Sequence, residues 1–262
     1  MGYRGIIYFL CLFCLAESIY SQPKSKKLIE DFISVGAAGF YSSSEYKGED
    51  DNLLVVPSIG VKVGGVTVRG FHASYYEKFN KKFSIGADLI FDWISRNRSK
   101  AQALQGMDRR KNPLFLGVGA SYLIWPVLVS TRLQYDLIGE SNGVVTSLDF
   151  STFVPLQKKL YFKPEIGVDF LSKKLSNFYY GVKSNEVMTG RPAYELDEIW
   201  KPYASLVVIY KVHPLFTVTG FSKYNFWLNN ISDSPITEPG NKFTFGVAAS
   251  FSWYFRETFN LN

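Results

Sequence analysis

The sequence lacks cysteine beyond its first fourteen residues. Its two cysteines, Cys11 and Cys14, both lie in an apolar run over residues 5–16 that follows a basic start. A basic start before an apolar run too short to span a membrane is typical of a secretory signal peptide, so we predict one over residues 1–21. A lipid-modified Cys14 is the alternative, which the bulky Phe13 disfavours. The exported chain would then hold no thiol for a disulfide bond or a metal site.

Long apolar runs are also missing. After the predicted signal peptide, no run is long enough for a transmembrane helix. Aromatic residues nevertheless make up 17% of the chain, and hydrophobic residues of all kinds make up 47%. Apolar content of this size without long runs is typical of β-strands that alternate apolar and polar side chains.

Groups suited to catalysis are scarce as well. The chain has two histidines, His72 and His213, and no nucleophile motif with a base and an orienting third group. Acidic residues cluster at 49–51 and 195–198 on predicted loops, where we expect them to be solvated or to bind divalent ions loosely. We therefore predict no enzymatic activity, no cofactor and no metal site. The net charge of +6 comes from scattered basic residues, which disfavours a nucleic-acid partner.

The last predicted strand, over residues 243–255, alternates two kinds of side chain without a break. Because successive side chains point to opposite faces of a strand, one whole face is apolar and the other is small or hydroxylated. A bilayer can cover such an apolar face, and only a closed barrel then satisfies the backbone. The apolar positions are Phe243, Phe245, Val247, Ala249, Phe251, Trp253 and Phe255.

Four more segments alternate in the same way, at residues 83–93, 127–137, 144–154 and 160–170. In each segment, large apolar residues share one face and charged or polar residues share the other. A charge on the lipid-facing surface at mid-membrane costs about 2–4 kcal/mol, so we expect the charged face to point into the barrel. The predicted inward charges are Asp88, Asp92, Arg132, Asp136, Asp149, Lys163, Glu165 and Asp169.

Six weaker strand candidates bring the count to about eleven. Short turns such as residues 155–159 alternate with long connections such as residues 172–201, which is typical of outer-membrane barrels. Because such barrels have an even number of strands, we predict twelve, with ten as the alternative, and a strand hidden within residues 64–83 or in a long loop. The weaker candidates are residues 32–40, 53–63, 66–76, 114–123, 203–210 and 216–228.

The predicted fold class is therefore all-β, a transmembrane antiparallel up-and-down β-barrel. A secreted β-sandwich would explain the alternation but not the outward aromatic face of the last strand. We expect a signal peptide at 1–21, a short basic segment at 22–31, the barrel at 32–255 and a C-terminal extension at 256–262. The expected location is the outer membrane of a Gram-negative bacterium, surrounded by lipid and lipopolysaccharide. Inward charges of both signs predict ion pairs or a narrow wet passage.

Several predicted loops carry clustered tyrosine, glycine, proline and acidic residues. Gly181 would permit a sharp reversal of its loop, and the prolines would stiffen theirs. The motif residues would either shape a rigid extracellular cap or contact a ligand. The motif residues are Tyr179, Tyr180, Gly181, Val182, Gly190, Pro192, Tyr194, Asp233, Ser234 and Pro235. Together with residues 46–51 and 104–109, they resemble the loops of the MipA/OmpV family of outer-membrane proteins. The most specific part of the resemblance is residues 179–182 followed by residues 233–235 at this spacing.

The resemblance covers residues 32–255 and implies an outer-membrane barrel without enzymatic activity. It implies a role as a scaffold that holds two periplasmic enzymes in one complex. One is a murein hydrolase of the lytic transglycosylase type, and the other is a peptidoglycan synthase. A narrow pore or permeability factor for small solutes, or a surface adhesin, is the alternative. Family members commonly end at the last strand, whereas this chain continues to Asn262.

Overall fold

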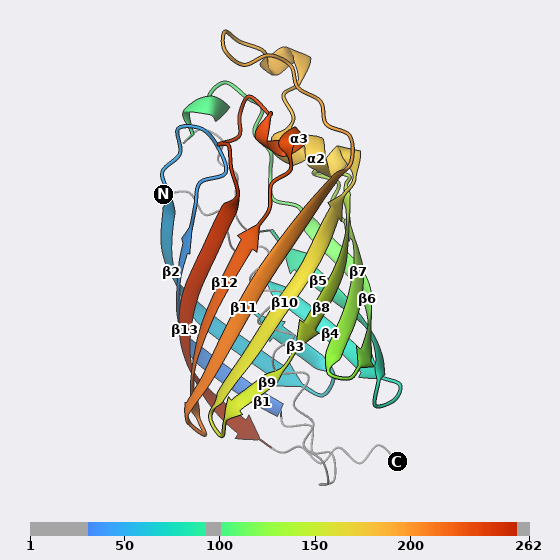
Figure 1. Ribbon diagram of the computed structural model, residues 1–262, viewed down its shortest axis with the longest axis vertical. Helices are drawn as coiled ribbons and strands as arrows, with labels where there is room; N and C mark the ends of the chain where they lie inside the picture. The colour runs from blue at the N-terminus through green and yellow to red at the C-terminus, as the bar shows by residue number, and fades with distance from the viewer. Residues whose placement is uncertain (1–30, 93–100, 256–262) are drawn as a thin grey trace.

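The computed structural model describes residues 31–92 and 101–255, which form one antiparallel sheet that closes into a barrel (Figure 1). Neighbouring strands pair in chain order, and β13 pairs with β1 to close the ring. The strands are β1 (Asp31–Ser42), β2 (Asn52–Val63), β3 (Val66–Arg69), β4 (His72–Lys78), β5 (Phe83–Phe91), β6 (Leu114–Ile124), β7 (Val127–Asp136), β8 (Val144–Thr152), β9 (Val154–Gln157), β10 (Leu160–Leu171), β11 (Ile199–His213), β12 (Phe216–Asn225) and β13 (Lys242–Phe255).

The barrel has twelve strands, because β9 continues β8. A break at Phe153 separates the two segments, and both pair with β10. The predicted fold class and the prediction of twelve strands are therefore confirmed, and the ten-stranded and β-sandwich alternatives are wrong. Apart from Asp31, the predicted signal peptide, basic segment and C-terminal extension lie outside the described residues.

One strand prediction is wrong in a way that explains the missing strand. Residues 66–76 were expected to form a single strand, but they form β3 and β4, joined by a tight turn at Gly70 and Phe71. Gly70 has a positive φ of 54°, a conformation that glycine adopts without steric cost. This turn lies at the end of the barrel where the other connections are long, which is why the order of short and long connections looked irregular.

The two ends of the barrel differ in their connections. At the turn end, the strands are joined at residues 64–65, 79–82, 125–126, 158–159 and 214–215, and β1 begins and β13 ends there. At the loop end lie four long loops: the first (43–51), the second (described at residues 92 and 101–113), the third (172–198) and the fourth (226–241). They contain the short helices η1 (Gln102–Leu104), α2 (Lys173–Tyr180), η2 (Ser184–Glu186) and α3 (Asn229–Ser232). No helix in the described part of the chain is long and apolar enough to cross a membrane.

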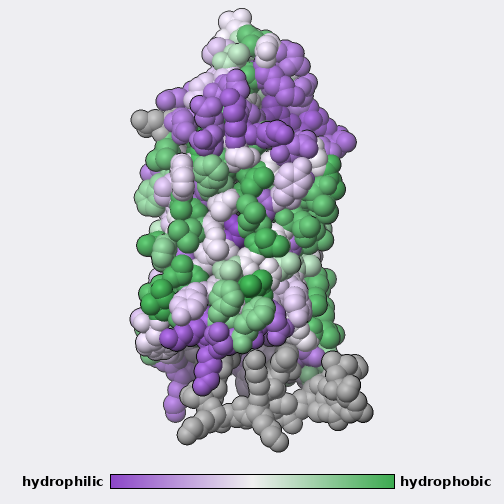
Figure 2. All heavy atoms as spheres, turned by 90° about the vertical axis from the view of Figure 1, so that its right-hand side faces the viewer, coloured by the Kyte–Doolittle hydropathy of each residue, from purple (hydrophilic) through white to green (hydrophobic). Residues whose placement is uncertain are grey.

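The outer face of the barrel is apolar around its middle. On β13, Phe245, Val247 and Trp253 are 44–54% exposed, whereas the intervening Thr244 and Ala248 are buried. Figure 2 shows a largely hydrophobic band over β4–β7, with hydrophilic residues above and below it. The alternation seen in the sequence therefore places the aromatic face outward, where lipid rather than protein covers it.

The inner face is divided between apolar and polar sectors. Buried apolar side chains from β1, β10, β11, β12 and β13 form one cluster inside the barrel, which includes Phe40, Val207 and Phe221. Half-buried residues of β2 pack against this cluster. Charged and hydroxyl side chains from β5, β7, β8 and β10 line the rest. The apolar sector was not predicted, because β11 carries apolar residues on both faces and its pattern does not fix which face turns inward.

Candidate functional site

The inward charges on β5 and β7 are paired with each other. Arg132 Nε lies 3.3 Å from Asp88 Oδ2, and Gln134 Nε2 donates a hydrogen bond of 2.8 Å to Asp88 Oδ1. The side chain of Asp88 is 1% exposed and that of Arg132 is 11% exposed. Burying a carboxylate without a partner is costly, so these contacts stabilise a charge that the strand pattern places inside.

A second group of charges lies on β8, β10, β11 and β12. Lys163 Nζ forms an ion pair of 2.9 Å with Glu165, and Tyr203 donates hydrogen bonds to both Glu165 and Asp149. Lys223 Nζ lies 3.5 Å from the centre of the Tyr203 ring. Lys223 also lies 3.6 Å from Asp169, which accepts a hydrogen bond of 2.7 Å from Ser147. Apart from the pair within β10, these contacts cross strands, so they join this second group into one network.

Two of the predicted inward charges hold loops. Asp136, at the loop end of β7, accepts hydrogen bonds from the backbone N–H and the hydroxyl of Ser141. Asp92, just after β5, accepts a hydrogen bond of 3.2 Å from the Tyr179 hydroxyl in α2. Both carboxylates are at most 1% exposed.

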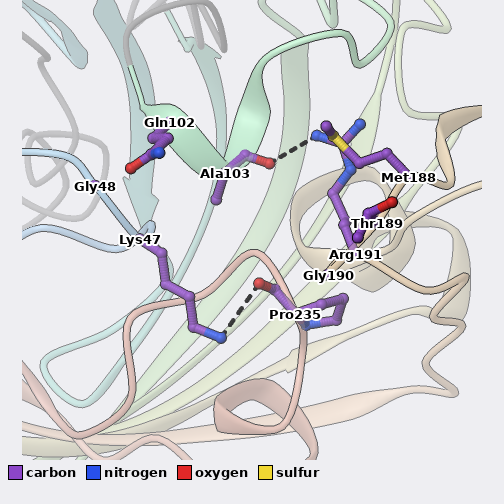
Figure 3. Close-up of a pocket in the computed structure, with 9 residues that line it drawn as sticks. All are labelled: Lys47, Gly48, Gln102, Ala103, Met188, Thr189, Gly190, Arg191 and Pro235. Carbon is purple, nitrogen blue, oxygen red and sulfur yellow. Dashed lines mark hydrogen bonds between the residues drawn. The ribbon is translucent and has the colours of Figure 1, made fainter.

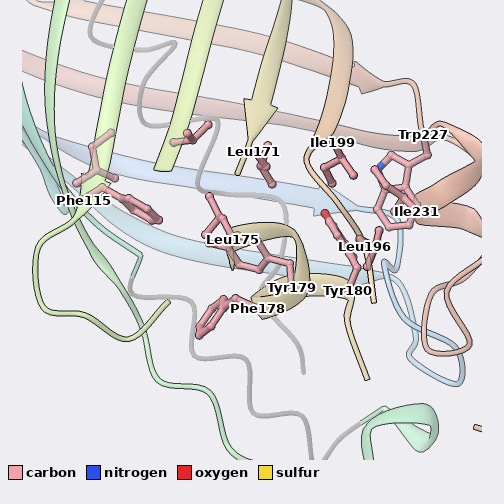
Figure 4. Close-up of a cluster of buried hydrophobic side chains, with 12 residues drawn as sticks. Phe115, Leu171, Leu175, Phe178, Tyr179, Tyr180, Leu196, Ile199, Trp227 and Ile231 are labelled. Carbon is pink, nitrogen blue, oxygen red and sulfur yellow. The ribbon is translucent and has the colours of Figure 1, made fainter. Parts of the chain in front are cut away.

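Helix α2 lies across the loop end of the barrel and packs on the strand ends. Its residues Leu175, Phe178, Tyr179 and Tyr180 form a buried cluster with Leu171 at the end of β10 and residues from other strands (Figure 4). Ile90 of β5 and Trp227 after β12 belong to the same cluster and come from opposite sides of the ring. The helix therefore bridges the mouth. We call this group the α2 cluster; its other members are Phe115, Val145, Leu196, Ile199 and Ile231.

A second apolar cluster unites all four long loops above α2. Each loop supplies at least one residue, and Tyr46 and Ile236 are fully buried. Backbone hydrogen bonds run between the loops, including Lys47 N–H to the carbonyl of Ile236 at 3.1 Å. The α2 cluster and this loop cluster together form a folded cap. The loop cluster comprises Tyr46, Ala101, Leu104, Val182 and Ile236.

The motif residues lie at the centre of this cap. Tyr46 Oη donates to the carbonyl of Tyr179 at 2.8 Å, and Ser234 Oγ donates to the carbonyl of Tyr180 at 2.7 Å. Two carbonyls at the end of α2 thus accept hydrogen bonds from the first and fourth loops. This arrangement supports the expectation that the motif residues shape a cap. Val182 pairs with Tyr194 as an isolated β-bridge within the third loop.

Gly181 is needed for space rather than for a reversal. Its φ of −77° and ψ of 155° are ordinary extended values, so the expected reversal of the chain at this residue is wrong. A Cβ at Gly181 would lie 2.8 Å from the carbonyl oxygen of Asn177. By contrast, Gly190 has a positive φ of 80° and open space around it, so its requirement is conformational.

Two residues that the sequence did not single out join the second and third loops. Arg110 and Glu186 are 6% and 1% exposed and form an ion pair of 3.0 Å. Arg110 Nη1 donates to the carbonyl of Asn177 at 2.6 Å, and Glu186 accepts from the backbone N–H groups of Asp108 and Lys183. The two partners lie 76 positions apart in irregular segments, so no local pattern could have identified them.

The cap holds a pocket of about 290 Å³ at its outer surface (Figure 3). All four long loops contribute to it. The amino group of Lys47 donates to the carbonyl of Pro235 at 3.2 Å, and Arg191 donates to the carbonyl of Ala103 at 2.9 Å. The remaining lining residues are Gly48, Gln102, Met188, Thr189 and Gly190.

Other predicted site residues lie apart from these features. Pro192 and Asp233 are exposed on the cap, and His213 is exposed at the turn end. His72 is buried on β4. The acids near residue 195 include Glu195 and Asp197, which pair with Lys173. Within residues 31–92 and 101–255, no group of three potential metal ligands is close enough to hold an ion.

Comparison with family models gives one match, which decides the family. The model of MltA-interacting protein MipA matches residues 35–255, which hold the barrel except for the first four residues of β1. The chain belongs to the MipA family. The resemblance of its loops is thereby confirmed, and the chain is an outer-membrane β-barrel of a Gram-negative bacterium.

Curated relatives align with this MipA-family chain over most of its length. Outer membrane protein YiaT of Escherichia coli K12 is 26% identical, over 91% of this chain and 97% of its own length. Outer membrane protein OmpV of Vibrio cholerae is 23% identical, over 79% of this chain and 75% of its own length. The MltA-interacting protein of Escherichia coli K12 is 26% identical, over 80% of this chain and 85% of its own length.

Solved structures of other proteins align with this chain at low similarity. The NanC porin aligns with a TM-score of 0.43 and 11% identity, over 83% of this MipA-family chain and 98% of its own. OmpT of Vibrio cholerae aligns with a TM-score of 0.37 and 10% identity, over 89% of this chain and 100% of its own.

In outer-membrane barrels the short turns face the periplasm and the long loops face outward, so the cap of this chain lies on the cell surface.

Proposed function

We propose that the protein is a non-enzymatic scaffold that holds a murein enzyme at the periplasmic end of its barrel. The observation that carries this proposal is the folded cap. Because the α2 cluster joins strands from opposite sides of the ring, the cap braces the barrel and covers its outer mouth. A barrel built in this way is suited to presenting a rigid surface rather than to exchanging solutes.

The luminal charges support the same proposal. Arg132 pairs with Asp88, Lys163 with Glu165, and Lys223 with Asp169. Two of these pairs join strands that are one strand apart in the ring, and the third lies within β10. All three neutralise charges that would otherwise attract a permeant ion. Their energetic role is to satisfy buried charges, which stiffens the polar sector of the barrel.

The turn end offers a surface for a periplasmic partner. Exposed lysines surround it at three turns, and Glu77 is the one exposed acid among the described residues of these turns and the adjoining strand ends. Trp125, which is 84% exposed, stands on another turn of the same rim. An acidic protein surface would complement this rim. The exposed lysines are Lys78, Lys81, Lys82, Lys158, Lys159 and Lys211.

The relative named MltA-interacting protein supports the choice of partner, since its match covers 85% of its own length. Affinity capture from detergent-solubilised envelopes tests the proposal. We expect the wild-type protein to retain a murein hydrolase or synthase, and the variant with Lys81→Glu and Lys82→Glu to lose it. A control variant with the same two charge reversals at the loop end, Lys111→Glu and Lys174→Glu, should retain the enzyme. Capture of no murein enzyme by the wild type would reject the scaffold.

A narrow pore is the second candidate, supported by the wall of charged residues inside the barrel. Planar-bilayer recordings on the purified protein distinguish the two. The scaffold predicts no discrete conductance steps, because the cap covers the mouth. Regular steps that respond to Lys163→Met or Asp88→Asn would favour the pore.

A further inference from the structure

Two cations line the outer pocket of the cap without a carboxylate partner. Lys47 and Arg191 form no ion pair within 4.0 Å with any described acid. Their described hydrogen bonds all go to backbone carbonyls: Lys47 to Pro235, and Arg191 to Ala103, Gln105 and Glu186. Neutral carbonyls fix the positions of both side chains but leave both charges without a counter-ion.

Arg191 is buried and held rigidly. It is 6% exposed, and its hydrogen bonds use Nε and Nη1. The Nη2 group is therefore left to donate to a ligand. A guanidinium fixed in one orientation is preorganised for an oxyanion, because little side-chain entropy is lost when the ligand binds.

The rest of the lining adds neutral donors and no acid. Figure 3 shows Lys47 and Arg191 on two sides of the pocket, with Gln102 and Thr189 beside them. The Gln102 amide and the Thr189 hydroxyl can donate hydrogen bonds, and Met188 supplies an apolar wall. These residues come from the first, second and third loops, so the cap must fold before the pocket exists.

We propose that this pocket binds one oxyanion, a phosphate monoester or a carboxylate, carried on a group of about one sugar ring or smaller. The volume of about 290 Å³ is at the low end for small-molecule sites and limits the size of the ligand. Lys47 on one side of the pocket and Arg191 on the other would supply the positive charge that attracts the anion, and either of them could donate a charge-assisted hydrogen bond to it. This inference goes beyond the scaffold, since the pocket opens on the cell surface and the rim faces the periplasm.

Acidic residues around the pocket restrict the ligand further. Glu49, Asp50 and Asp233 are near neighbours of lining residues in the sequence, although none of them lines the pocket. Their negative charges would repel an extended polyanion. A ligand with a single anionic group is therefore favoured over an anionic polymer.

Calorimetric titration of the purified full chain in a non-ionic detergent tests the proposal. The probes are inorganic phosphate, glucose 6-phosphate, glucuronate and, as a neutral match, glucose. We expect at least one of the three anions to bind and glucose not to bind. The variant Lys47→Met should weaken anion binding tenfold or more, because it removes one of the two positive charges of the pocket. Since Lys47 is exposed, its loss should leave the cap folded. The control Lys174→Met removes an exposed lysine of α2 that does not line the pocket, and should stay within twofold.

The source of the anion is distinguished by a second arm with lipopolysaccharide micelles, before and after removal of phosphate. Binding that depends on Lys47 in this arm alone assigns the pocket to the surrounding lipid, and binding in the soluble arm alone assigns it to a free solute. The variant Arg191→Lys keeps the charge but loses the planar fork, and should weaken binding. Heat-modifiability on gels then reports that the barrel is folded, and unchanged trypsin cleavage at Lys183 reports that the cap is intact. Anion binding that Lys47→Met leaves unchanged, or no anion binding in either arm, would overturn the proposal.

Discussion

Arg110 and Glu186 form a buried ion pair of 3.0 Å that ties the second long loop to the third. Arg110 also donates to the carbonyls of Asn177 and Phe178 at the end of α2. The pair therefore connects the helix that bridges the mouth with the loops above it. Since charges that leave water are stabilised only by their partners, the two residues depend on each other.

Removal of one partner should open the cap. We expect Arg110→Met to destabilise the cap by about 3–5 kcal/mol, because it leaves Glu186 buried without its counter-ion. Trypsin cleavage of intact cells at Lys183 measures this, and the variant should be cut much faster than the wild type. Glu140→Gln weakens only the surface bridge to Lys111, away from Lys183, and should change cleavage little. Equal cleavage of the Arg110 variant and the wild type would contradict the anchoring role.

The lipid-facing orientation of β13 gives a second prediction. Val247 is 54% exposed near the middle of the strand, so Val247→Arg should destabilise the barrel by about 2–4 kcal/mol. Ile124 is 60% exposed at the turn end of β6, and Ile124→Arg should cost about 0–1 kcal/mol, because the charge there reaches the interface. Urea unfolding in lipid vesicles compares the two. Similar losses for both variants would mean that the apolar band does not face a bilayer.

The sequence was sufficient for the wall of the barrel because strand period fixes the direction of each side chain. Asp149 and Lys163 are buried as expected, since their neighbours on both sides are large and apolar. The same logic fails for β3, whose four residues are too few to display a period. It also fails for Val207, which lies in a strand that is apolar on both faces.

The cap could be predicted only in outline. The motif around Tyr179 marked the correct loops, but α2 was not predicted there, and the contacts that it makes are set by packing between distant segments. The hydroxyl of Ser234 reaches the carbonyl of Tyr180 across 54 positions. Irregular loops have no period that would reveal such a contact. For this reason the sequence also gave no indication of the pocket between Lys47 and Arg191.

The bridge between Asp108 and Lys183 makes a prediction about pH. The hydrogen bond from Lys183 lowers the pKa of Asp108 below its usual value of 3.8. A lowered pKa means that the contact stabilises the folded cap above pH 3.8 and is lost as the pH falls through the lowered pKa. Carboxyl NMR of the labelled protein should show Asp108 titrating below 3.8. Lys183→Gln should raise that midpoint, and an unchanged midpoint would contradict the bridge.

The cap should also control whether the barrel conducts. Residues 183–193 are enclosed by the bridge between Val182 and Tyr194, so they can be replaced by a short Gly-Ser linker that leaves the barrel strands intact. This change removes Glu186 and Arg191, which hold Arg110 and the second loop. We expect α2 to lose its anchor and single-channel recordings to show conductance steps that the wild type lacks. A variant that unfolds would lose heat-modifiability on gels, which separates unfolding from opening. A folded variant that stays silent would show that the luminal charge network, rather than the cap, closes the barrel.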